Sequence, residues 1–83
     1  MMINCINGDN KMENKLYIQR IRKLRKDHGY TQEKVASYLG TSQTMYARYE
    51  RGANKLPVRH LIMLCKLYHV SSDYILGLTN DTF

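Results

Sequence analysis

Residues 31–52, with the sequence TQEKVASYLGTSQTMYARYERG, contain the pattern that decides the fold. Thr31 can accept hydrogen bonds from the free amides of a first helical turn, and apolar residues follow it at helical spacing. Gly40 comes directly after them, where the end of a helix favours a residue that tolerates positive φ. Thr41 or Ser42 can then cap a second short helix. Two such helices joined by a glycine-containing turn form a helix-turn-helix, whose second helix can enter the major groove of DNA.

The flanking sequence predicts three further helices and no strand. The first runs from about Asn14 to His28, because apolar residues recur there at helical spacing before a glycine. Another begins near Pro57, whose missing amide proton is tolerated in a first turn. The last is capped by Ser71 or Ser72. The residues expected to face the core are Tyr17, Ile21, Leu24, Val35, Ala36, Leu39, Tyr46, Tyr49, Val58, Leu61, Leu64, Cys65, Tyr68, Ile75 and Leu76.

The length of the chain and these helices define one domain. A chain of 83 residues has room for one modest core. We therefore expect an all-α, compact five-helix domain over residues 14–83, with the helix-turn-helix at its second and third helices. Residues 1–13 show no hydrophobic periodicity, and we expect them to form a flexible head. Tyr46 is expected to place its ring in the core and its hydroxyl at the rim.

The positive charge is concentrated around the helix-turn-helix. The formal net charge is +6. Residues 15–34 hold seven basic and two acidic residues, and residues 48–59 hold four basic residues and one acidic residue. A solvated helix face explains the basic residues of the first helix, whereas those just after the second motif helix favour contact with phosphates.

Other function classes find no support in the sequence. No apolar run approaches the roughly 18 residues of a membrane span, and the first residues lack a signal-peptide core. The two cysteines, Cys5 and Cys65, have no metal-ligand spacing, and His28, His60 and His69 stand on different predicted helices. No set of nucleophile and base can be assembled. We expect a cytoplasmic protein that is not an enzyme and that has no metal, no cofactor and no membrane contact.

Four short motifs carry a resemblance to a known family. They are IRKLRKDHGYTQ at 21–32, ASYLGTS at 36–42, RYERG at 48–52 and HVSSDYILGL at 69–78. In this order and spacing, the chain from about Tyr17 to Leu78 resembles the phage-repressor family, of the Cro and lambda-repressor-like, xenobiotic-response-element type. The resemblance implies a lambda-repressor-like fold and a sequence-specific transcription regulator, expected to be a repressor, that binds double-stranded DNA.

The start of the second motif helix is expected to read bases. The resemblance and the position on the helix assign this role to Gln43, Thr44 and Arg48. Glutamine can pair with adenine and arginine with guanine. Met45 or Ala47 can touch a thymine methyl group. Arg48 can alternatively hold a phosphate.

Phosphate contacts are expected from two other places. Gln32 matches a family glutamine at the start of the first motif helix, where the side chain and the helix amides can both meet a phosphate. Arg51, Asn54 and Lys55 follow the second motif helix, where similar proteins hold the DNA backbone. The alternative roles are local capping for Gln32 and loop solubility for the other three.

The resemblance also implies one internal contact and an oligomeric state. Arg25 and Glu50 match a partly buried salt bridge that links the first helix to the end of the third. Family members dimerise on near-palindromic operators, with recognition helices about 34 Å apart. We expect a homodimer whose interface uses Tyr74, Leu78, Phe83 and Met63. The alternative is an antitoxin-like module that acts mainly through a protein partner bound by the head and the tail.

Overall fold

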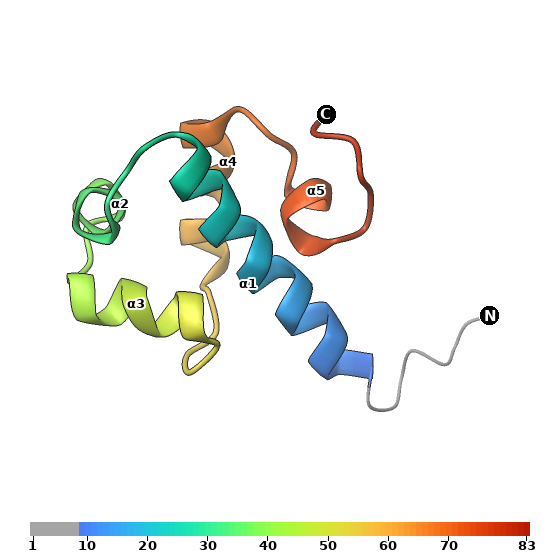
Figure 1. Cartoon of the computed structure of the whole chain (residues 1–83), viewed down its shortest axis with the longest axis horizontal. Helices are drawn as coiled ribbons and strands as arrows, with labels where there is room; N and C mark the ends of the chain where they lie inside the picture. Colours follow the sequence, from blue (N-terminus) through green and yellow to red (C-terminus); the bar gives the residue numbers. More distant parts are fainter. Residues whose placement is uncertain (1–8) are drawn as a thin grey trace.

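The computed structural model describes residues 9–83, with side chains from Leu16 onward, and this part of the chain is all-α (Figure 1). No strand occurs in this range. The expectation of an all-α domain with five helices is confirmed. The helices are α1 (Asp9–Asp27), α2 (Gln32–Leu39), α3 (Gln43–Arg51), α4 (Val58–Tyr68) and α5 (Ser72–Leu76).

The first helix is longer than the sequence predicts. It begins at Asp9 and not at Asn14, so residues 9–13 belong to α1 and not to a head. The other residues of the head expected over 1–13 lie outside the described part of the chain. The acidic and polar residues of this stretch carry no apolar stripe, so the hydrophobic period could not indicate the extra turns.

Side-chain caps set the ends of the helix-turn-helix. Thr31 Oγ1 accepts a hydrogen bond from the Lys34 amide at 3.0 Å, and Ser42 Oγ accepts one from the Met45 amide at 3.0 Å. Gly40 ends α2 with a φ of 76°, in the left-handed region. These local contacts explain why α2 and α3 are short and separated by a tight turn. Of the two possible caps for α3, Ser42 is the one that acts.

Helix α1 runs through the middle of the molecule, with α2 and α3 on one side and α5 on the other (Figure 1). Helix α4 packs against α2 and α5 and closes the core. Apolar side chains from all five helices and from the turn before α5 meet there. The buried residues are Ile21, Leu24, Val35, Ala36, Leu39, Tyr46, Tyr49, Leu64, Tyr68, Val70 and Ile75.

Three expectations about the core are wrong. Val58 is 69% exposed, because the buried face of α4 centres on Leu64 and Val58 lies about 120° around the helix from it. Leu76 is exposed, because it stands about 100° from the fully buried Ile75 on α5. Tyr46 is fully buried, and its hydroxyl lies inside the molecule and not at the rim.

Candidate nucleic-acid interface

Helix α3 presents its first turn to solvent. Its buried side chains are Tyr46, Tyr49 and Glu50, which fall at positions i, i+3 and i+4. This phase leaves Gln43 and Thr44 exposed at the N-terminal end, after the Ser42 cap. Of the sequence-predicted base-reading residues, Gln43 and Thr44 therefore lie on the outer face of α3. Ala47 and Arg48, one turn later on the same face, are half-buried.

Arg48 is held by a neighbouring loop. Its Nε donates a hydrogen bond to Asn54 Oδ1 at 2.9 Å, and Asn54 Nδ2 donates to Met45 Sδ at 3.3 Å. Met45, expected to touch a thymine methyl group, is half-buried and packs against the core. Asn54, expected to contact phosphate, turns its amide toward α3.

The other phosphate candidates differ in their surroundings. Arg51 and Lys55 are exposed, and neither side chain makes a hydrogen bond within residues 16–83. Gln32 is half-buried, and its Nε2 donates to Glu50 Oε1 at 3.1 Å. The sequence did not indicate this contact, because Gln32 and Glu50 belong to different helices.

Glu50 is the centre of a buried polar network. Arg25 Nε lies 2.7 Å from Glu50 Oε2, and Arg25 Nη2 donates to Oε1 at 3.0 Å. The ion pair that the resemblance implies is therefore present in the structure. Arg22 Nη2 also donates to the Glu50 carbonyl oxygen at 2.8 Å, near the C-terminal end of α3.

The network fixes the charge of Glu50. Burial alone raises the pKa of this carboxyl, but the hydrogen bonds from Arg25 and Gln32 and the positive charge of Arg25 outweigh burial and bring the pKa below its ordinary value. Burial raises the pKa of Tyr46. Helix α3 is thus anchored to α1 and α2 by a carboxylate that stays ionised at neutral pH.

The expected dimer residues fall into two groups. Leu78 and Phe83 are 71% and 81% exposed. Met63 is half-buried against the core, and Tyr74 is half-buried with its ring centroid 4.2 Å from the Arg20 guanidinium carbon. Only the first two therefore present free apolar surface.

Arg20 has a role that the sequence did not indicate. Its guanidinium donates to the carbonyl oxygens of Tyr74 and Thr79, the latter at 2.7 Å, and to Asn80 Oδ1 at 2.9 Å. It therefore fastens the C-terminal segment to α1. No motif could have revealed this, because the partners are 54 to 60 residues apart in the chain and two of them are backbone atoms.

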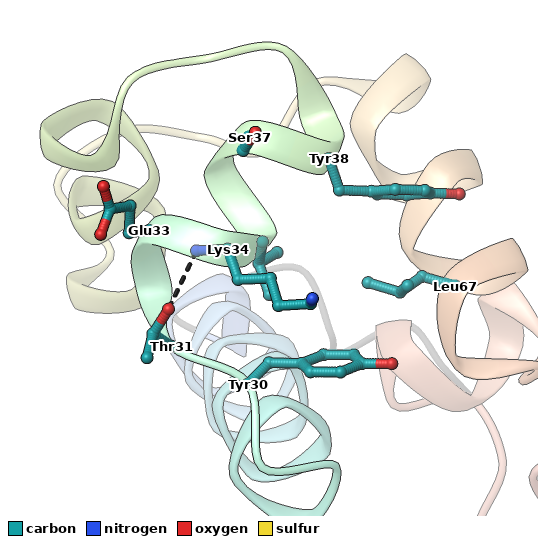
Figure 2. Close-up of a pocket in the computed structure, with 8 residues that line it drawn as sticks. Tyr30, Thr31, Glu33, Lys34, Ser37, Tyr38 and Leu67 are labelled. Carbon is teal, nitrogen blue, oxygen red and sulfur yellow. Dashed lines mark hydrogen bonds between the residues drawn. The ribbon is translucent and has the colours of Figure 1, made fainter.

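A groove of about 600 Å³ opens between α2 and α4 (Figure 2). Figure 2 shows the rings of Tyr30 and Tyr38 on either side of the Lys34 and Leu67 side chains. The Lys34 ammonium lies 5.6 Å from the Tyr30 ring centroid. No residue of α3 lines the groove, so it is separate from the candidate base-reading surface. Its lining residues are Tyr30, Thr31, Glu33, Lys34, Val35, Ser37, Tyr38 and Leu67.

Within the described residues, no group of three or more histidine, cysteine or acidic side chains could hold a metal ion. No helix in that range has both the length and the apolar character needed to cross a bilayer.

Comparison with known proteins places this geometry in a family. The model of the family described as helix-turn-helix matches residues 21–75. The chain belongs to this family of Cro and lambda-repressor-like helix-turn-helix proteins, which are DNA-binding transcription regulators. No solved structure matches the chain.

Relatives from Bacillus subtilis (strain 168) support this membership. The chain is 47% identical over 66 residues to the uncharacterized HTH-type transcriptional regulator YobD, covering 80% of this chain and 59% of that protein. It is 36% identical over 59 residues to the HTH-type transcriptional regulator ImmR, covering 71% of this chain and 46% of that protein. It is 40% identical over 63 residues to the uncharacterized HTH-type transcriptional regulator YazB, covering 75% of this chain and 90% of that protein. The chain thus spans only about half of YobD and ImmR.

Proposed function

We propose that this chain is a sequence-specific regulator of transcription, a cytoplasmic repressor that binds a near-palindromic operator as a homodimer. The observation that carries the proposal is the exposed first turn of α3, with Gln43 and Thr44 at its tip and Arg48 one turn later. Helix α3 is anchored from behind through Glu50, so its outer face is held as a rigid surface.

Each residue on this face has a chemistry suited to DNA. Gln43 carries the amide that pairs with adenine N6 and N7, and Arg48 carries the donors that pair with guanine O6 and N7. Thr44 can contact either type of base edge. These side chains point from one helix face, as insertion of a helix into the major groove requires.

Phosphate contacts come from the ends of the motif. Arg51, the last residue of α3, and Lys55, in the loop that follows, are exposed and bring positive charge beside the outer face of α3. The N-terminal end of α2 offers free amides and the second amide proton of Gln32. These groups supply affinity that falls with salt and is the same for every sequence.

The exposed apolar side chains near the C-terminal end form the proposed dimer interface. Leu78 and Phe83 lose water-exposed area when a second copy covers them, which favours association. On a near-palindromic operator, the dimer has to present its two copies of α3 to one face of the DNA, one helical turn apart.

Selection from a randomised DNA pool, followed by titration of the selected site at several salt concentrations, tests the function. We expect an enriched palindrome whose affinity falls steeply with salt. Gln43→Ala should change the preferred sequence, whereas Lys55→Ala should weaken all sequences alike and reduce the salt slope by about 0.9 per protomer, or about 1.8 for the dimer. No enrichment, with only weak salt-sensitive binding, contradicts the proposal and favours a partner-dependent module, for which co-purification of a second protein is the next experiment.

The oligomeric state has its own test. Sedimentation with and without the selected DNA should show a dimer for the wild type and a monomer for the Leu78→Ser, Phe83→Ser double variant. Val58→Ser is the matched control, because Val58 is 69% exposed but lies on α4. A wild type that is monomeric on and off DNA contradicts the dimer.

A further inference from the structure

The side chain of Asn54 faces α3, the proposed reading helix, and not the solvent. Asn54 is half-buried, whereas its neighbours Ala53 and Lys55 are exposed. Its Oδ1 accepts the Arg48 Nε proton at 2.9 Å. Its Nδ2 is directed at Met45 Sδ, 3.3 Å away. Both ends of the amide are therefore engaged with α3.

The orientation of this amide follows from its partners. Arg48 has only donors, so the atom that faces it has to be the amide oxygen. The amide nitrogen then faces Met45, whose sulfur is a weak acceptor. A phosphate needs a donor, and one of the two Nδ2 protons is directed at Met45 while the bond to Arg48 holds the whole amide against α3. Asn54 is thus poorly placed for the phosphate contact that the sequence predicts.

The loop backbone holds Asn54 in this position. Gly52 turns the chain with a φ of 78°. The amides of Ala53 and Asn54 then both donate to the Arg48 carbonyl oxygen, at 2.9 and 3.3 Å. Asn54 is therefore bonded to Arg48 twice, through its side chain and through its backbone amide. This double attachment leaves little freedom in the distance between Asn54 and Arg48.

The hydrogen bond from Arg48 to Asn54 determines which nitrogens of the guanidinium remain free to bind DNA. An arginine carries five donors in a planar fork. With Nε bonded to Asn54, both terminal nitrogens remain for a ligand, and they can meet guanine O6 and N7 end-on. The side-chain freedom that a free arginine loses on binding is already reduced in the unbound protein.

We propose that Asn54 is a positioning residue that sets base preference through Arg48 and does not itself bind phosphate. The proposal rests on the function proposed above, in which α3 reads bases. It assigns Arg48 to guanine and not to the DNA backbone. Met45 supports the arrangement by orienting the Asn54 amide and does not act as a separate base contact.

The test compares DNA-pool selections and salt slopes for the wild type and for Arg48→Ala, Asn54→Ala, Asn54→Asp and Lys55→Ala. In Asn54→Ala, discrimination at the guanine read by Arg48 should fall by roughly 3- to 10-fold, part of what a bidentate arginine–guanine pair supplies. The salt slope should not change. Asn54→Ala should have no further effect on base preference when Arg48 is already alanine. Thermal melting checks that each variant is folded.

Two controls separate positioning from phosphate binding. Asn54→Asp keeps an oxygen for Arg48 Nε, so it should preserve the base preference while its charge lowers affinity for every sequence. Lys55→Ala should lower affinity for every sequence and reduce the salt slope by about 0.9 per protomer, or about 1.8 for the dimer. An Asn54→Ala variant that behaves like Lys55→Ala, with a uniform loss and a smaller slope, overturns the proposal.

Failure of this inference can be told from failure of the proposed function. If the wild type enriches a sequence that Arg48→Ala or Asn54→Ala enriches equally well, the inference is overturned and the function stands. If the wild type enriches nothing, the proposed function fails and the inference fails with it.

Discussion

Arg25 and Glu50 form a two-point ion pair that fastens α3 to α1. Arg25 Nε and Nη2 lie 2.7 and 3.0 Å from the two carboxylate oxygens of Glu50. The two side chains are only 12% and 3% exposed. Gln32 adds a third helix to the same carboxylate. One side chain thus fixes the reading helix relative to α1 and α2.

Removal of Arg25 should destabilise the protein strongly. Arg25→Ala leaves the buried Glu50 carboxylate without its counter-charge, which typically costs about 3–5 kcal/mol in the free energy of unfolding. Urea denaturation at pH 7 measures this loss. DNA affinity should fall as a secondary effect, because α3 loses its anchor.

A surface ion pair on the same helix provides the control. Lys23 and Asp27 are 2.7 Å apart, but their side chains are 66% and 54% exposed. Lys23→Ala should therefore change the free energy of unfolding far less than Arg25→Ala does. Equal stabilities for Arg25→Ala and the wild type would refute the role given to the buried pair.

Acid should destabilise the protein in two steps. Burial, together with the nearby Arg59, lowers the pKa of His60 below 6.5, so folding favours the neutral ring. The contribution of His60 is present above about pH 6.5 and is lost as pH falls toward the folded-state pKa. The pKa of Glu50 is lowered from 4.5, so its contribution is present above that pH and is lost at lower pH.

The His60→Phe variant isolates the first step. Phenylalanine keeps an aromatic ring beside Tyr49, whose centroid lies 5.7 Å from that of His60. Thermal melting from pH 7.5 to 3 should show that this variant loses the stability change just below pH 6.5 and keeps the one below pH 4.5. An unchanged slope just below pH 6.5 would show that His60 does not cause it.

The sequence predicted the helices of the motif because their ends are local. Thr31 and Ser42 cap the amides three residues ahead, and Gly40 adopts the positive φ that its position demands. Burial was predicted less well near helix ends, where one residue of error rotates a side chain by about 100°. The burial predictions for Val58 and Leu76, the first residue of α4 and the last of α5, are wrong for this reason.

The predicted site residues show which features of the site the spacing of residues along the sequence can predict and which it cannot. Gln43 and Thr44 lie on the exposed face of α3, since their placement depends only on the phase of one helix. Gln32, Asn54 and Arg20 instead turn onto partners in other segments. These contacts depend on how elements pack, and no pattern of spacing within a single element encodes them.

Gly52 should tolerate a side chain less well than Gly40. Both residues have positive φ, 78° and 76°, where a Cβ costs roughly 1–2 kcal/mol. A Cβ on Gly40 meets nothing within 4 Å, whereas one on Gly52 lies 2.7 Å from Ile18 Cδ1. Gly52→Ala should therefore lower the free energy of unfolding by about 1 kcal/mol more than Gly40→Ala.

Ile18→Val tests this cause directly, because valine lacks the Cδ1 atom. In a double-mutant cycle, Gly52→Ala should cost less in the Ile18→Val background than in the wild type. The same cycle with Gly40→Ala should be additive, since that site is open. Additivity for both glycines would mean that crowding by Ile18 is not the cause.

Arg20 should hold the C-terminal segment in place. Its guanidinium binds the carbonyl oxygens of Tyr74 and Thr79 and stacks on the Tyr74 ring. The Ser71 amide in turn donates to the Thr82 carbonyl at 2.7 Å. Arg20→Ala should cost about 2 kcal/mol in unfolding free energy and should speed hydrogen exchange at the Ser71 amide.

Arg20→Lys should not restore this protection, because a compact ammonium cannot reproduce a planar fork that bonds several oxygens while stacking on a ring. If Leu78 and Phe83 form the dimer interface, releasing the segment that carries them should also weaken dimerisation. Sedimentation of Arg20→Ala over a range of concentrations measures this, with Lys23→Ala as the control from the same helix. Slow exchange at Ser71 together with undiminished dimerisation in Arg20→Ala would show that the segment holds its position without Arg20.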